Sequence, residues 1–205
     1  MRLPLVTLTL IFFFLNFSGM PIDPHETAKK KPSASKKKVV KQEPSLKVMD
    51  KGKVSPHAMK VFLLQNNGEA DTNAVKKLIK VYIIEANREG VNYEAAFCQM
   101  CLETGFLRFE GSVSRYQNNY CGLGCVDMFS GGDWFANMEE GVRAHIQHLK
   151  AYASLEPLRT PVVDPRFNNV QRGSVKLVTD LTGRWATDPD YGQKIAALIK
   201  RLHSV

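Results

Sequence analysis

The sequence predicts a mostly α-helical single domain that follows a disordered basic tail. From residue 55 onward, apolar residues recur at helical spacing, between Ser, Asp or Asn residues that start helices and Gly residues that stop them. Between residues 20 and 54, lysine, proline and serine dominate and apolar residues are sparse. The chain has 205 residues, of which 44% are hydrophobic and 23% are charged, and this suits one globular domain with additional segments.

The first 19 residues have the pattern of a secretory signal peptide. Arg2 precedes an apolar run from Leu3 to Leu15, which is shorter than the roughly 20 residues of a membrane-spanning helix. The cleavage site is poor, because Phe17 or Asn16 lies where a small residue is usual. We therefore expect residues 1–19 to be a signal peptide or an uncleaved N-terminal anchor, and the domain to be exported to the periplasm or cell envelope.

Residues 20–54 are expected to form a disordered linker that is rich in Lys, Pro and Ser. Between Met20 and Lys60 there are 11 lysines against four acidic residues, whereas residues 61–205 carry 16 basic and 16 acidic residues. The net charge of +8 therefore belongs to the tail, and a neutral domain has no electrostatic reason to bind nucleic acid. The tail is either a solvated tether or a segment that contacts an anionic envelope surface.

The domain itself, residues 55–205, is expected to be helical with one long loop. Six helices are predicted, over residues 55–66, 71–90, 92–105, 138–152, 175–181 and 191–202. Ser55 is an N-cap followed by proline at the first helical position, and Gly90 and Gly105 stop the second and third helices. Residues 106–124 form a loop or a short hairpin between the third and fourth helices.

Glu103 lies in the last turn of the third predicted helix, and this position indicates a general acid. A carboxylate at a helix C-terminus meets the negative end of the helix dipole, and the apolar neighbours Leu102 and Phe106 would desolvate it. Both effects raise the pKa of the carboxyl group, as a general acid near neutral pH requires. A solvent-facing Glu at a helix end, without any catalytic role, is the alternative.

Polar and aromatic side chains elsewhere are candidates for binding a sugar. Gln117, Asn118 and Asn119 offer amide donors and acceptors for hydroxyl and acetamido groups, although Asn is also favoured in turns. Trp185 and Tyr191 flank the turn before the last helix. Their rings could present flat faces to sugar rings, and core packing explains each of them nearly as well.

All four cysteines lie close in sequence to this acid and loop. Cys98 and Cys101 share one face of the third helix, and Cys121 and Cys125 lie in the loop. In an exported protein an even count favours disulfides, here two bridges between helix and loop. The pairing is open, with Cys98–Cys125 and Cys101–Cys121 favoured, and a four-cysteine zinc site or free thiols are the alternatives.

A metal site is not expected elsewhere. His145 and His148 are one helical turn apart, but no Cys or carboxylate at ligand spacing completes a site with them. Packing or hydrogen-bonding roles suit them better. We therefore expect neither a metal nor another cofactor.

Three segments together resemble one known family. They are AFCQMCLETGFLRFEG, QNNYCGLG and WATDPDYGQKI, and the resemblance is to the glucosaminidase domain of bacterial cell-wall hydrolases, glycoside hydrolase family 73. It covers roughly residues 56–202 and implies a lysozyme-like fold. It also implies cleavage of the β-1,4 bond after N-acetylglucosamine in peptidoglycan glycan strands, by a protein that we expect to be monomeric.

The resemblance assigns roles to particular residues. Glu103 matches the catalytic general acid, Tyr191 matches an aromatic residue of the cleft, and Asn118 and Asn119 match the substrate-side loop that runs into Gly122. We expect no cell-wall-binding repeat after the domain. Glu110 stands where glycine is more usual in the family.

Glycoside hydrolysis usually needs a second carboxylate besides the proton donor. Asp127, just past the glycine loop, and Glu110 are candidates for it, and Glu139 and Glu140 are further options. The substrate's own acetamido group offers another route. The functional alternatives are a muramidase or lytic transglycosylase of the same superfamily, and a catalytically silent glycan-binding module.

Overall fold

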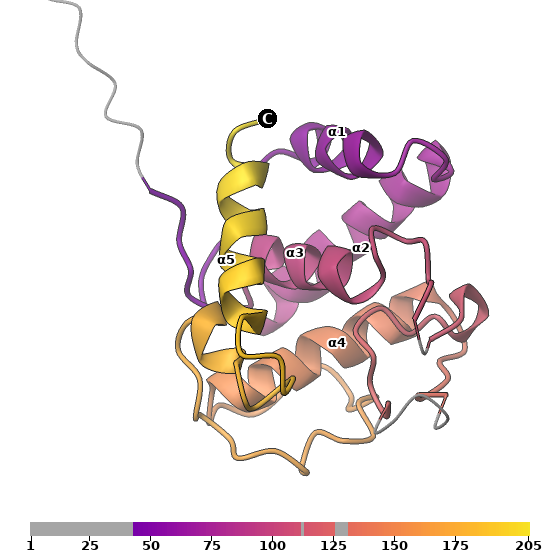
Figure 1. Cartoon of the computed structure of the whole chain (residues 1–205). Coiled ribbons are helices and arrows are strands. Elements are labelled where there is room, and N and C mark those ends of the chain that lie inside the picture. The colour runs from indigo at the N-terminus through magenta and orange to yellow at the C-terminus, as the bar shows by residue number, and fades with distance from the viewer. Residues whose placement is uncertain (1–42, 112, 126–130) are drawn as a thin grey trace, which may run out of the picture. The chain divides into compact units, whose positions relative to one another are not determined.

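The structure, a computed structural model of the chain, describes residues 43–111, 113–125 and 131–205 (Figure 1). Its helical elements are α1 (Pro56–Asn66), α2 (Thr72–Glu89), α3 (Tyr93–Glu103), α4 (Met138–Ala153) and α5 (Tyr191–Leu202), with 3-10 turns η1 (Arg115–Gln117) and η2 (Val178–Leu181). Across these ranges the β-structure is limited to isolated bridges, so the expected loop or hairpin is a loop. The prediction of a mostly α-helical domain is confirmed. The expected signal peptide, residues 1–19, lies outside the described residues.

Helix α3 is the buried centre of the domain. It packs against α2, α4 and α5, while α1 packs against α2 and α5 (Figure 1). Nine of its 11 residues are buried. The side chain of Asn92 caps its first turn by accepting a hydrogen bond from the backbone N–H of Glu94, at 3.0 Å. Of the helices in the described part of the chain, none combines the length and apolar character needed to cross a membrane.

Residues 43–54, which we call the N-terminal strap, pack against the domain, although the sequence placed them in the disordered linker. The backbone N–H of Val48 donates to the carbonyl of Lys176 at 3.0 Å, and the N–H of Val178 donates to the carbonyl of Leu46 at 2.9 Å. The side chain of Val48 is completely buried. The folded part therefore begins before the expected boundary at residue 55, because a short apolar stretch among the lysines finds a place on the core.

The strap also explains why the helix expected over residues 175–181 is absent. Only the 3-10 turn η2 forms there, from Val178 to Leu181. Lys47 and Leu177 form an isolated antiparallel bridge, so the strap uses backbone groups that a longer helix would need for its own hydrogen bonds. The apolar residues of this segment are spaced so that they can be buried, but they do not form an α-helix.

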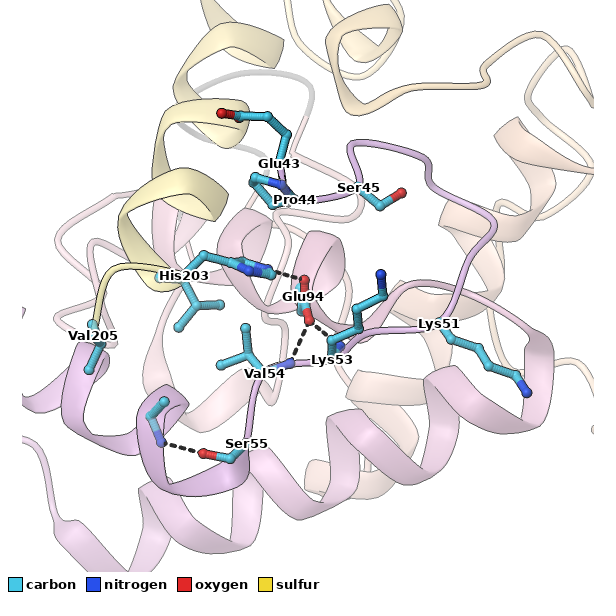
Figure 2. A pocket seen from close by; sticks show the side chains of 12 residues that line it. Glu43, Pro44, Ser45, Lys51, Lys53, Val54, Ser55, Glu94, His203 and Val205 are labelled. Atoms are coloured by element: carbon cyan, nitrogen blue, oxygen red, sulfur yellow. Dashed lines mark hydrogen bonds and ion pairs between the residues drawn. The ribbon is translucent and has the colours of Figure 1, made fainter. Parts of the chain in front are cut away.

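Glu94 joins the strap to two helices (Figure 2). Its carboxylate is almost fully buried in the first turn of α3, and it accepts hydrogen bonds from the backbone N–H groups of Lys53 and Val54, the latter at 2.7 Å. Its other oxygen lies 2.7 Å from Nε2 of His203, just past the end of α5. A surface cavity of about 290 Å³ opens around this cluster, and Glu103 is not among its lining residues.

A buried ion pair holds the segment after α4. The side chains of Glu89 and Lys150 are both fully buried, with Nζ of Lys150 2.8 Å from a carboxylate oxygen of Glu89. The carboxylate also accepts hydrogen bonds from Arg159 and Thr160, and Lys150 donates to the carbonyl of Pro157 at 2.8 Å. Every charge in the cluster is therefore compensated, and removal of one partner would leave a bare charge in the core.

The substitution Lys150→Met tests this account. It leaves the Glu89 carboxylate buried without its cation, so we expect the free energy of unfolding to fall by about 3–5 kcal/mol. Lys194→Met is the matched control, because Lys194 pairs with Asp188 at the surface, where both side chains are well exposed. Urea unfolding should show a large loss for the first variant and little change for the second. Equal losses in the two variants would contradict the assignment.

Candidate active site

Glu103 is the last residue of α3, and Tyr191 is the first residue of α5. The hydroxyl of Tyr191 donates a hydrogen bond to Oε1 of Glu103. The same hydroxyl oxygen accepts a hydrogen bond from Nε2 of Gln99, at 2.7 Å. Because Gln99 lies one turn before Glu103 on the same helix, the acid and the phenol are held together by two contacts between α3 and α5.

Burial raises the pKa of Glu103 to about 7. Hydrogen bonds from the side chains of Tyr191 and Trp185 act in the opposite direction, because they stabilise the carboxylate form. The sequence-based expectation of a raised pKa agrees with this result, and burial is its largest cause. Glu103 can therefore hold a proton near neutral pH and, when it loses that proton, remain stabilised by two donors.

The turn after Glu103 has a left-handed backbone. Gly105, Phe106, Leu107 and Phe109 all have φ between 56° and 68°. The turn is closed by Thr104, whose hydroxyl oxygen accepts from the N–H of Leu107 at 2.9 Å. The Thr and Gly that follow the acid thus end α3 sharply, so the carboxyl group of Glu103 is not covered by a further turn of helix.

Gly122 lies against the other oxygen of the acid. A Cβ atom at Gly122 would stand 3.4 Å from Oε2 of Glu103, and the φ of Gly122 is +70°. A surface cavity of about 260 Å³ is lined by Gly122, Gly124, Cys125 and Trp185, among others. Glu103 is not itself among the lining residues, but Gly122, which lies against its Oε2, is, so this cavity lies next to the acid.

The amide side chains of the loop hold the loop itself. Asn119 is fully buried and donates to the carbonyls of Leu123 and Asp133, at 2.8 and 3.1 Å. Gln117 is also buried and bonds backbone groups on both sides of the loop. Asn118 donates to the carbonyl of Phe135 at 3.0 Å. This geometry favours the structural role over direct sugar binding: the amides place Gly122 beside the acid.

A glycine on α4 allows the loop to approach closely. A Cβ atom at Gly141 would stand 1.8 Å from the carbonyl oxygen of Asn118. Real Cβ atoms do not approach that closely, so the loop rests directly on the backbone of α4. The position of the loop therefore depends on residue 141 being a glycine, which has no side chain.

The two aromatic residues proposed from sequence as sugar platforms lie mostly inside the protein. Tyr191 is 4% exposed, so its hydroxyl rather than its ring face reaches the site. Trp185 is partly buried and packs edge-on to His148, with ring centroids 4.9 Å apart. It also lines the 260 Å³ cavity, where part of its surface remains available.

The structure separates the candidates for a second carboxylate. Asp127 lies outside the described residues. Glu110 is exposed and lines a different cavity, of about 560 Å³, whose lining does not include Glu103. Sequence reasoning missed Asp133 and Asp164: Asp133 pairs with Arg166 at 2.8 Å, and Asp164 bonds Nδ1 of a histidine, His148, at 2.8 Å. A Cβ atom at Gly124 would meet Asp133 at 2.7 Å, which places this carboxylate beside the glycine loop.

Glu139 and Glu140, the further options, are occupied at the start of α4. Glu139 pairs with Lys77 at 3.0 Å, and Glu140 accepts from the backbone N–H of Ala136 at 3.0 Å. Both contacts are typical of acidic residues in the first turn of a helix. Neither residue is placed against Glu103 by these contacts.

The expectation of disulfides is wrong for this structure, in which all four cysteines are free thiols. Cys98 and Cys101 are completely buried in α3, and Cys121 is 1% exposed beside the acid. Burial raises the pKa of each of these thiols. They pack as small apolar groups. In the described ranges, moreover, no three His, Cys, Asp or Glu side chains are grouped to hold a metal ion.

The part of the chain that holds this site is similar to known proteins. Residues 79–204 match the profile of the glucosaminidase family, described as mannosyl-glycoprotein endo-beta-N-acetylglucosaminidase. An uncharacterized protein of Borreliella burgdorferi strain B31 is 43% identical over 155 residues, which are 76% of this chain and 76% of that protein. A crystal structure of S. aureus autolysin E in complex with the muropeptide NAM-L-Ala-D-iGlu is 14% identical, with a TM-score of 0.49, over 78% of this chain and 71% of that chain.

The family match spans more than half of the chain and includes Glu103, Gly122 and Tyr191. The chain therefore belongs to the glucosaminidase family, the endo-beta-N-acetylglucosaminidases.

Proposed function

We propose that this chain is a glycoside hydrolase that cleaves the β-1,4 bond after N-acetylglucosamine in peptidoglycan glycan strands, with Glu103 as the general acid. One observation carries the proposal: a carboxyl group with a pKa of about 7 ends a buried helix beside a surface cavity. Such a group is protonated in a large fraction of molecules at neutral pH. Membership of the glucosaminidase family supports the same chemistry.

The contacts of Glu103 suit donation of a proton to the leaving oxygen of the glycosidic bond. Tyr191 donates to Oε1, so the transferable proton belongs on Oε2, which faces Gly122. When the proton leaves, the new carboxylate is stabilised by the hydrogen bonds from Tyr191 and Trp185. These donors strengthen as negative charge develops, which lowers the barrier to proton transfer.

The group that attacks the sugar is assigned by experiment among three candidates. Asp127 follows the glycine loop in sequence, Asp133 lies against Gly124, and the acetamido group of the substrate is the third. Arg166 pairs with Asp133 at 2.8 Å, so the carboxylate of Asp133 is held in one place. Asp127→Asn and Asp133→Asn, compared in one assay with Glu110→Gln at a different cavity as the control, identify the partner; loss of activity in neither of the two favours the acetamido route.

We also propose that the enzyme acts in the cell envelope, because the first 19 residues have the pattern of an export signal and the tail is basic. The family description names the glycan of a mannosyl-glycoprotein. Digestion of both glycans distinguishes the two substrates. For peptidoglycan, a reducing-end N-acetylglucosamine in the products supports our assignment, and an anhydromuramic end indicates a lytic transglycosylase.

Glu103→Gln should abolish lysis of purified peptidoglycan, because the amide has no transferable proton. Release of soluble fragments, measured by mass spectrometry, should fall to background. A fully active variant would refute the assignment of the acid. Binding to peptidoglycan should persist, and binding without products in the wild-type protein would indicate a glycan-binding module instead.

Glu103→Gln should also be more stable than the wild type at pH 8. Its thermal unfolding transition would show at the same time that the variant is folded. The folded-state pKa of Glu103, about 7, lies above its ordinary value of 4.5. As pH rises through this range, the folded protein holds a proton that the unfolded chain releases, so the free energy of unfolding falls, by roughly 3 kcal/mol in total. Thermal unfolding at pH 4 and pH 8 measures this contribution as a difference: the stability of Glu103→Gln relative to the wild type should increase by this amount from pH 4 to pH 8.

Tyr191→Phe should change the pH dependence of activity in a defined direction. The active form has Glu103 protonated, so activity falls as pH rises through about 7. Loss of the Tyr191 hydrogen bond destabilises the carboxylate, which raises the pKa of Glu103 and moves this fall to higher pH. The maximal rate should drop, because the carboxylate product is less stabilised. A lower rate with an unmoved pH profile would assign Tyr191 a purely structural role.

A further inference from the structure

The hydrogen bonds at the acid continue into the core as a chain that crosses four helices. Gln99 on α3, which donates to Tyr191, accepts at its Oε1 from Nε2 of His145 on α4, at 3.0 Å. Nδ1 of His145 lies 2.9 Å from the hydroxyl of Tyr82 on α2. Each of these four side chains is less than 5% exposed. The chain therefore runs from Tyr82 through His145, Gln99 and Tyr191 to Glu103.

Such a chain has two internally consistent directions. In the forward direction, the Tyr82 hydroxyl donates to Nδ1 of His145, Nε2–H of His145 donates to Gln99, and Tyr191 must then donate to Glu103. In the reverse direction the Gln99 amide is turned over, His145 carries its proton on Nδ1, and Tyr191 donates to Gln99 instead of to the acid. The two directions therefore differ in whether Tyr191 donates a hydrogen bond to Glu103.

Tyr82 distinguishes the two directions. Its hydroxyl is fully buried, and within the described ranges its one hydrogen-bond partner is His145. In the forward direction the hydroxyl hydrogen has Nδ1 as its acceptor. In the reverse direction Nδ1–H donates to the hydroxyl oxygen, and the hydroxyl hydrogen is left in the core without an acceptor, which is unfavourable. The buried end of the chain therefore favours the forward direction.

We propose that His145 is a positioning residue whose neutral Nε2–H form, selected by Tyr82, obliges Tyr191 to donate to Oε1 of Glu103 and so reserves Oε2 for the transferable proton. The proposal rests on the proposed function of Glu103. It assigns His145 and Tyr82 to the site, although neither touches the acid. It also gives His145 a role in hydrogen bonding and not in metal binding.

The charged and titratable surroundings agree with a neutral imidazole. Burial lowers the pKa of His145 to about 3, and His148 on the same helix acts in the same direction. Tyr82 faces its Nδ1, and Trp185 packs against its ring with centroids 5.7 Å apart. Around Glu103 the other titratable groups are Tyr191, Cys121 and Cys125.

Burial also raises the pKa of the Tyr82, Tyr191, Cys121 and Cys125 side chains, so all four remain neutral at neutral pH. Among the side chains of the hydrogen-bond chain, Glu103 is the one with a pKa of about 7.

The first test reads the proton on His145 directly. Nitrogen-15 chemical shifts of the imidazole, assigned through bonds to the His145 backbone, distinguish the two neutral forms and the cation. We expect the Nε2–H form, with Nδ1 as an acceptor, from pH 5 to pH 8 in the wild-type protein. A Nδ1–H form or an imidazolium in the folded protein would overturn the proposal. The result requires no activity, so it stands apart from the proposed function.

The second test removes the end of the chain. Tyr82→Phe keeps the ring but leaves both directions with one unsatisfied group, so His145 and Gln99 should populate the reverse direction. Tyr191 then donates to Glu103 in fewer molecules, and the pKa of Glu103 should rise by about one pH unit, as expected when a hydrogen bond to a carboxylate weakens. Carbon-13 shifts of the Glu103 carboxyl measure this pKa, and the alkaline fall in activity should move by the same amount.

Tyr93→Phe is the matched control. Tyr93 is also buried and donates one hydrogen bond, at 3.0 Å to the carbonyl of Val54, outside the chain. It should lose stability without any change in the pKa of Glu103. The proposal is wrong if both variants leave that pKa at the wild-type value. If Glu103→Gln were active while the pKa still moved in Tyr82→Phe, the proposed function would fail and the positioning of the carboxyl group would stand.

Discussion

The burial of α3, of which nine of the 11 residues are buried, is the constraint on which the rest of the domain depends. Within this buried part, a polar side chain cannot be left without a partner. The amide of Asn92 therefore caps α3 and binds strap carbonyls, the carboxylate of Glu94 binds strap N–H groups and His203, and Gln99 binds His145 and Tyr191. These partners come from the strap, α4 and α5, so one helix orders all of them. Glu103 lies at the end of this helix and takes its position from the core.

Two acids of the domain, Glu89 and Glu103, illustrate opposite solutions to the cost of removing a carboxyl group from water. Glu89 is compensated by Lys150 and by hydrogen bonds from Arg159 and Thr160, and its pKa is lowered although burial alone would raise it. Glu103 accepts a hydrogen bond from Tyr191 and forms no ion pair within the described residues, and its pKa is raised by burial. The first arrangement stabilises the fold at neutral pH. The second weakens it above the ordinary pKa of a glutamate and leaves a group that can donate a proton.

Local signals were sufficient for part of this structure. Cap chemistry correctly predicts that helices begin after Ser55 and Asn92 and that one ends before Gly105. Glu103, at a helix end, has the raised pKa that its position predicts. The strap was missed because it directly follows a lysine-rich stretch, although its apolar residues Leu46, Val48, Met49 and Val54 pack on the core. The roles of the amide side chains and the state of the cysteines were left with alternatives, because sequence does not say which way a side chain points. Residues such as Gln99 and His145 carry no local signal, since their roles arise only when distant helices meet.

The contact between Gly141 and the Asn118 carbonyl has a consequence for how such a protein can vary. The loop beside the acid is seated on bare helix backbone, with no room for a methyl group. A heritable change of this one codon to alanine would push the loop away while every chemical group of the site remained encoded. Loss of function could thus arise at a position whose residue has no reactive or polar side chain. In a comparison of natural variants, an intact set of acidic and aromatic residues would then be an insufficient sign of a working enzyme.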